Sequence, residues 1–185
     1  MVPEPVPAQT YLDPEPRTWP KVLGILGALW GGIGLVSSAL ALAGVGQQSQ
    51  PAIMRGGLGA ATNAVAALLA LAMLVGGVQL VRQRAMGVRL MQAWAPLSAL
   101  AQAAVLAIMI THRAEFEQSF RDEMERQAEA RGGQGAPQGM EKVMFTVGLG
   151  CGGVLAVIPP AIVAVFVFGR RGREALAEWS TQAGV

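Results

Sequence analysis

The chain has 185 residues, of which 52% are hydrophobic and only 14% are charged. An ordinary soluble domain carries about 25% charged residues, so this balance indicates a membrane protein. The formal net charge of +2 is small, and the basic residues flank apolar runs without interleaved aromatics, so we expect no nucleic-acid partner. The single cysteine, Cys151, excludes an intramolecular disulfide and a cysteine-rich zinc site.

The first 20 residues hold six of the 11 prolines and few apolar side chains. Such a segment cannot bury enough apolar surface to offset the loss of chain entropy. We therefore predict that residues 1–20 form a disordered, proline-rich tail.

Four apolar segments follow, and each is long enough to cross a bilayer. A helix needs about 20 predominantly apolar residues to span the hydrocarbon core. None of the four segments contains an ionisable Asp, Glu, Lys, Arg or His; they are residues 22–45, 58–81, 90–111 and 143–169. The sequence therefore predicts an all-α integral membrane protein with four transmembrane helices, which together make a domain over residues 21–169.

One alternative remains open for the first segment. Residues 41–43 are Ala-Leu-Ala, which fits the A-x-A pattern of a signal-peptidase site. Cleavage there would leave three spans instead of four.

Lys and Arg residues beside the membrane predict the orientation, because cytoplasmic loops are enriched in them. An N-terminus inside places eight basic residues on the cytoplasmic side, whereas the other side receives Arg55 and a longer loop rich in acids. We therefore predict that both termini are cytoplasmic and that residues 170–185 form a basic cytoplasmic tail. The arginine-, glycine- and alanine-rich composition is typical of a GC-rich bacterial genome, which favours a bacterial inner membrane.

The loop between the third and fourth spans is predicted to be helical over residues 113–131. Phe116, Phe120 and Met124 form a narrow apolar stripe on this segment, and i,i+4 ion pairs cover the rest of its surface. The third span is expected to continue outward as an extramembrane extension. Two interpretations remain open. The helix is either exposed to solvent on all sides with ion pairs along its surface, or its apolar stripe contacts another subunit or the lipid surface.

Small residues inside the spans predict where the helices pack, because lipid provides no hydrophobic drive between helices and association needs close backbone approach. The first span carries a stripe of such residues at helical spacing, and the second has a similar face. We expect these two faces to pack together; their members include Gly24, Gly27, Gly31, Gly34, Gly59 and Asn63.

Polar side chains at depth need partners in lipid. Gln102 of the third span is expected to donate a hydrogen bond to Asn63, which would fix the register of the two helices. The alternative is that Asn63, Ser98 and Gln102 line a small polar pathway.

The fourth span is the most irregular. Six residues, 148–153, are Gly-Leu-Gly-Cys-Gly-Gly, and Pro159 and Pro160 follow. Each proline removes a helical hydrogen bond and clashes with the preceding turn, so we predict a kinked or broken helix at this pair. Broken helices form binding sites in transporters, whereas tight packing of a kinked helix is the simpler interpretation.

The spans offer no ionisable group, and the chain holds one histidine. Enzymes and pumps that work inside membranes rely on such groups. We therefore expect no enzymatic activity, no catalytic residue, no cofactor and no metal. The leading hypothesis is an accessory, scaffold or interaction subunit whose partners are the lipid bilayer and other membrane subunits or itself; the alternative is a small transporter or channel.

Overall fold

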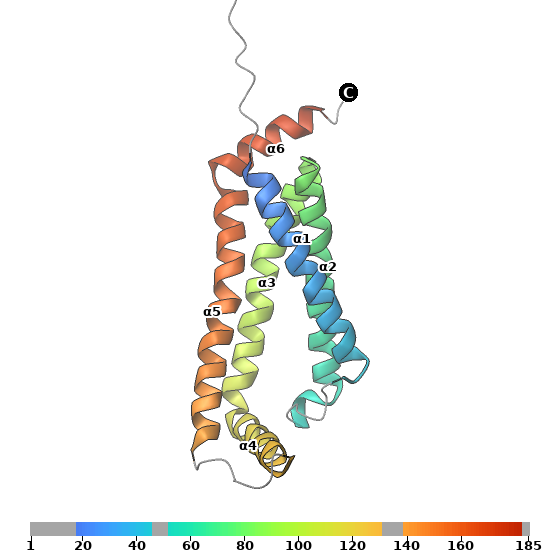
Figure 1. The fold of residues 1–185 in the computed structure, drawn as a ribbon. Coiled ribbons are helices and arrows are strands. Elements are labelled where there is room, and N and C mark those ends of the chain that lie inside the picture. The colour runs from blue at the N-terminus through green and yellow to red at the C-terminus, as the bar shows by residue number, and fades with distance from the viewer. Residues whose placement is uncertain (1–17, 46–51, 131–138, 183–185) are drawn as a thin grey trace, which may run out of the picture.

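A computed structural model describes residues 18–45, 52–130 and 139–182 (Figure 1). These residues form seven helical elements and no strand. In chain order they are α1 (Trp19–Leu42), the 3₁₀ turn η2 (Ala52–Met54), α2 (Gly57–Val81), α3 (Ala85–Thr111), α4 (Arg113–Ala130), α5 (Met140–Phe168) and α6 (Arg170–Gln182). Nearly all of the predicted tail over residues 1–20 lies outside the described residues.

Four of these helices are long and apolar enough to cross a membrane. They are α1, α2, α3 and the part of α5 from Lys142 to Phe168. Helices satisfy all their backbone hydrogen bonds internally, which is what a lipid environment requires. The chain is thus an all-helical, multi-pass membrane protein.

All four spanning helices begin before the predicted apolar runs, and α1 and α3 show why. Helix α1 starts at Trp19 because Pro20 lies in its first turn, where a missing N–H costs nothing. Helix α3 starts at Ala85 and so includes Arg89, whose exposed side chain can extend its charge toward water while the stem stays apolar.

The spans converge at one end of the bundle and separate toward the other. Figure 1 shows α1 with α2, and α3 with α5, meeting near α6 and diverging toward α4. The fully buried side chains Leu80, Val88, Met91 and Val167 lie at the convergent end. Helix α6 lies across this end and adds Ala175 and Trp179 to the same core.

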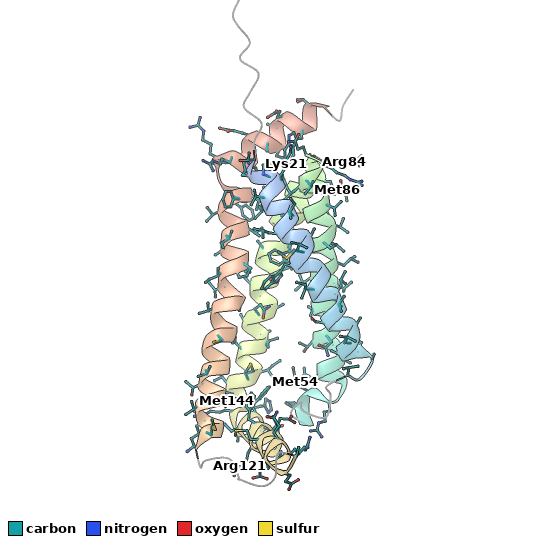
Figure 2. The ribbon with its side chains drawn as sticks, in the orientation of Figure 1. Lys21, Met54, Arg84, Met86, Arg121 and Met144 are labelled. Atoms are coloured by element: carbon teal, nitrogen blue, oxygen red, sulfur yellow. The ribbon has the colours of Figure 1, made fainter. Side chains whose placement is uncertain are left out.

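Charged groups lie at the two ends of the bundle. Figure 2 shows Lys21 and Arg84 at the end that carries α6, and Arg121 at the opposite end. Helix α1 begins, and α6 lies, at the Lys21 end. Both ends of the described chain are therefore on the same side of the bundle, as an even number of spans requires.

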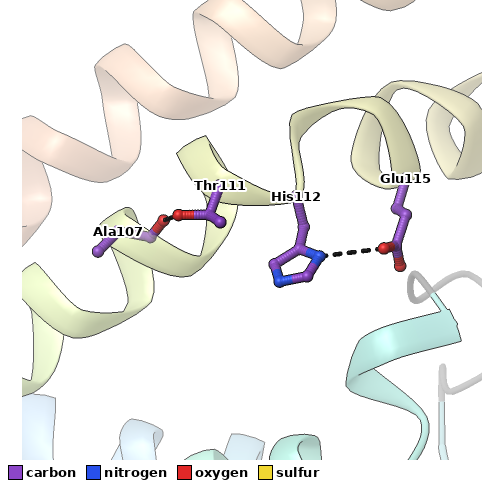
Figure 3. A network of polar contacts seen from close by, with 4 residues as sticks. All are labelled: Ala107, Thr111, His112 and Glu115. Carbon is purple, nitrogen blue, oxygen red and sulfur yellow. Dashed lines mark hydrogen bonds and ion pairs between the residues drawn. The ribbon is translucent and has the colours of Figure 1, made fainter.

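The segment after the third span is helical, as predicted, but α3 does not continue directly into it. The expected outward continuation of α3 is therefore corrected. The helix turns at His112, whose carbonyl accepts hydrogen bonds from the N–H groups of Glu115 (3.0 Å) and Phe116 (3.2 Å). Its ring Nδ1 lies 3.0 Å from a carboxylate oxygen of Glu115 (Figure 3). His112 thus starts a new helix, and α4 leaves the direction of α3 and lies across the end of the bundle (Figure 1).

Of the two forms predicted at Pro159 and Pro160, a kinked or a broken helix, the break is corrected, because α5 runs without interruption from Met140 to Phe168. Each proline removes one hydrogen bond, to the carbonyl of Leu155 or Ala156, but both keep a backbone angle that suits a helix. Long membrane helices tolerate such pairs because the adjacent turns hold the helix together.

Candidate functional site

The glycine face of α1 lies directly against the backbone of α2. A Cβ atom added at Gly24 would lie 2.6 Å from the carbonyl oxygen of Gly77, and one added at Gly31 would lie 2.5 Å from the amide nitrogen of Leu74. Real Cβ atoms essentially never come this close to another heavy atom. Glycine at these positions is what allows α1 and α2 to approach so closely.

The other predicted packing residues meet different neighbours. A Cβ at Gly27 would lie 2.9 Å from the terminal methyl of Met91 on α3, and one at Gly34 would lie 3.0 Å from the Cβ of Ala70. Gly59 packs instead against the backbone of Met54, at the turn that leads into α2. The α1 stripe therefore contacts both α2 and α3, whereas Gly59 of α2 contacts the preceding turn η2.

Asn63 and Gln102 are not brought together. Asn63 is half-buried on α2 and Gln102 is exposed on α3. Within the described ranges neither side chain forms a hydrogen bond, because α2 and α3 separate toward the end that carries α4. The polar bond that does link spans was not predicted: Gln92 donates its side-chain amide to the carbonyl of Val167, at 3.0 Å, and so joins α3 to α5.

A cavity of about 460 Å³ occupies the region where the helix pairs separate. Helices α1, α2, α3 and α5 all contribute to its wall, and no charged side chain of the described residues does. Its lining includes Trp30, Ser37, Ser38, Ala66, Ala70, Trp94, Ser98, Ala101, Gln102, Ile108 and Pro160. Of the three residues of the predicted polar pathway, Ser98 and Gln102 line this cavity and Asn63 does not.

Two serine residues in the cavity wall are almost completely buried, and neither side chain forms a hydrogen bond within the described part of the chain. Ser38 is 7% exposed and Ser98 is 5% exposed. In contrast, the hydroxyl of Thr62 on the same wall donates to the carbonyl of Leu58 at 2.8 Å. The fully buried polar atom of this wall that lacks a partner among the described residues is the indole Nε1 of Trp94, whereas the two serine hydroxyls are not fully enclosed, so a ligand in the cavity can bond to them.

A second cavity, of about 360 Å³, lies between α3 and α5. It is lined almost entirely by apolar side chains, and Gln102 is the one polar residue that reaches it as well as the first cavity. Neither cavity was predictable from residue spacing, because Trp30 and Trp94 look like ordinary apolar positions in their spans. The tilt between the helix pairs, which opens the larger cavity, leaves no signal in a single sequence.

Part of the apolar stripe of the outer helix α4 is buried against α5. Phe116 is 8% exposed, and its ring centroid lies 6.5 Å from that of Phe145 on α5. The guanidinium of Arg113 lies 5.5 Å from the same Phe145 ring. Phe120 and Met124 stay partly exposed. The prediction that Phe116 docks a partner is therefore corrected, because the turn at His112 brings its ring against α5.

The glycines of α5 differ from those of α1 and α2. A Cβ added at Gly148, Gly150, Gly152 or Gly153 would meet no described atom within 4 Å. Three of the four are exposed, and Gly153 is half-buried. The described chain thus uses its α1 glycines for internal packing and leaves the α5 glycines without a neighbouring helix.

No known protein family, curated protein or solved structure matches this chain. Its function must therefore be argued from its own geometry. Among the described residues no three His, Cys, Asp or Glu side chains lie together as a metal site would require. The features that remain are the packed α1–α2 face, the uncharged cavity and the open glycine face of α5.

Proposed function

We propose that this protein is a non-enzymatic accessory or scaffold subunit of a bacterial inner membrane, and that it assembles with another membrane helix through α5. The observation that carries this proposal is that Gly148 and Gly152, which lie four residues apart and so share a helix face, meet no described atom within 4 Å, as is also the case for Gly150 and Gly153 on the other side of α5. The partner is a transmembrane helix, either of another subunit or of a second copy of this chain.

The energetic argument rests on the cost of glycine in a helix. Glycine is about 1 kcal/mol less favourable than alanine at an interior helical position. Four glycines within six residues of α5 therefore weaken this helix without any internal contact in return. In membranes, close helix–helix contact is the usual compensation, because small residues let two backbones approach.

The orientation belongs to the same proposal. The end of the bundle that carries α6 holds Lys21, Arg82, Arg84, Arg89, Arg170, Arg171 and Arg173 beside the spans. Helix α4, at the other end, mixes basic residues with many acids. The bias of Lys and Arg places the α6 end and both termini in the cytoplasm.

Replacement of both Gly148 and Gly152 by leucine should abolish assembly and leave the monomer folded. These two residues lie four apart and so share a helix face, where two leucine side chains would block a partner backbone. We expect at least a tenfold loss of the cross-linked complex in membranes, measured by cross-linking and mass spectrometry after gentle detergent extraction. The thermal unfolding temperature of the purified protein should not fall, because no internal contact is lost and leucine favours the helix more than glycine does.

The matched control is Gly32→Leu, which changes a glycine of α1 that also meets nothing within 4 Å. This variant should assemble like the unmodified protein. A complex that survives the Gly148→Leu and Gly152→Leu changes, or a protein that is monomeric in its native membrane, would refute the proposed role of α5.

A small transporter or channel is the second candidate function, and the cavity between the helix pairs favours it. Ser98 and Gln102 give part of its wall hydrogen-bonding capacity. Solute-dependent uptake into proteoliposomes by the purified protein alone would support this candidate and contradict an accessory role.

A further inference from the structure

We infer that the larger cavity is a binding site for a neutral, single-chain amphiphile from the bilayer, such as a monoacylglycerol. This site goes beyond the proposed assembly through α5, and it would exist whether or not that assembly forms. The inference rests on the length of the cavity, the chemistry of its wall and the two buried serines that lack partners.

The cavity is long in the direction of the helices. Its lining on α3 extends from Trp94 to Ile108. At a rise of 1.5 Å per residue this corresponds to about 21 Å of helix, which is most of the hydrocarbon thickness of one bilayer. On α2 the lining extends from Ala61 to Met73, so both walls follow the same direction. An elongated space of this kind fits a hydrocarbon chain better than a compact solute.

The wall of the cavity selects an apolar and uncharged ligand. Most lining side chains are Ala, Val, Leu, Ile, Met and Trp, and none is Asp, Glu, Lys or Arg. A phosphate or ammonium headgroup would have to leave water without an opposite charge, which costs several kcal/mol. A hydroxyl or ester headgroup needs only hydrogen bonds.

The polar groups of the wall lie around the middle of the cavity and not at its ends. Ser98 lies one turn beyond Trp94 on α3, Gln102 lies one turn further, and Ser38 faces the same cavity from α1. Their hydrogen-bonding groups are free within the described part of the chain. A glycerol or ester group at this level would bond to them, and its hydrocarbon chain would lie along the apolar wall between Trp94 and Ile108.

Photolabelling of the full chain in phosphatidylcholine nanodiscs tests this site. The probe is a monoacylglycerol that carries a diazirine and an alkyne on its acyl chain, and labelled residues are mapped by mass spectrometry after proteolysis. We expect the label to concentrate on cavity residues between Trp94 and Ile108. Unlabelled mono-oleoylglycerol should compete for it, whereas a phosphatidylglycerol of the same chain length should compete at least tenfold more weakly.

Two sets of variants link the label to the cavity. Ala101→Phe should fill the space and reduce labelling at least tenfold, whereas Ala93→Phe adds the same ring at an exposed position of α3 outside both cavities and should leave labelling unchanged. Replacement of Ser38 and Ser98 by alanine keeps the space but removes two hydrogen bonds, which should weaken competition by mono-oleoylglycerol about tenfold. Ser180→Ala on α6 is the control for loss of a hydroxyl, since this serine bonds only to the local carbonyl of Ala177.

Label spread evenly over the exposed surfaces of the spans, or label that unlabelled mono-oleoylglycerol cannot displace, would overturn the inference. Equal competition by the phosphatidylglycerol would overturn the requirement for a neutral headgroup. If Ala101→Phe fails to fold, competition on the unmodified protein still decides the outcome. Loss of the α5 assembly has no bearing on this readout, so the two proposals can fail separately.

Discussion

Gly31→Ala should destabilise the protein by about 1–3 kcal/mol, the range found when a packed interior receives one extra group. The new methyl group would lie 2.5 Å from the amide nitrogen of Leu74 and 2.7 Å from the carbonyl oxygen of Ala70. Both are backbone atoms of α2, so no side chain can rotate away to relieve the clash. The two helices would have to separate along their whole contact.

The neighbouring residue provides the matched control. Gly32 meets no described atom within 4 Å, so Gly32→Ala should be neutral or should stabilise α1 by up to about 1 kcal/mol, because alanine favours the helix. Thermal unfolding of both variants in mild detergent, followed by tryptophan fluorescence, measures the difference. Equal unfolding temperatures for the two variants would contradict the close α1–α2 contact.

Trp179→Ala should release α6 from the end of the bundle. Trp179 is 6% exposed and belongs to the same buried cluster as Val88, Val167 and Ala175. Removal of a buried tryptophan side chain costs about 3–5 kcal/mol, and the loss falls on a helix of only 13 residues, too short to be stable without its packing against the core. Amide hydrogen exchange of residues 170–182 should therefore accelerate at least a hundredfold.

Trp30→Ala removes the same ring from a position that is 53% exposed on α1. This control should leave hydrogen exchange in α6 unchanged. Retained protection of α6 in Trp179→Ala would mean that this helix is held by something other than its apolar side, and would refute the assignment of α6 to the core.

Hydrophobic runs and residue spacing predict much of this fold. The four spans follow from length and apolarity alone, because a lipid environment leaves helices as the only choice for such segments. The spacing of Gly24 and Gly31 predicts one face of α1, and the structure puts that face on α2. Such features depend on period and residue size, which a single sequence displays directly.

Other features depend on three-dimensional relationships that spacing does not encode. The apolar residues of α3 before His112 and the charged residues of α4 after it both favour helix, so nothing in their pattern marks the turn there. Gln92 finds the carbonyl of Val167 only because α3 and α5 pack together. The divergence of the helix pairs, and with it the cavity, results from the tilt of whole helices, which the sequence analysis could not predict.

The number and direction of the spans are the central claim, and labelling of single cysteines in intact cells tests them most directly. Cys151→Ser provides a background without cysteine. Single cysteines are then placed at Arg55, Arg84, Glu129 and Thr181, and a maleimide that cannot cross the inner membrane is added before or after lysis. Arg55→Cys and Glu129→Cys should react in intact cells, and Arg84→Cys and Thr181→Cys should react only after lysis. Reaction of Arg55→Cys and Arg84→Cys from the same side would show that α2 does not cross the membrane, and would contradict the four-span account.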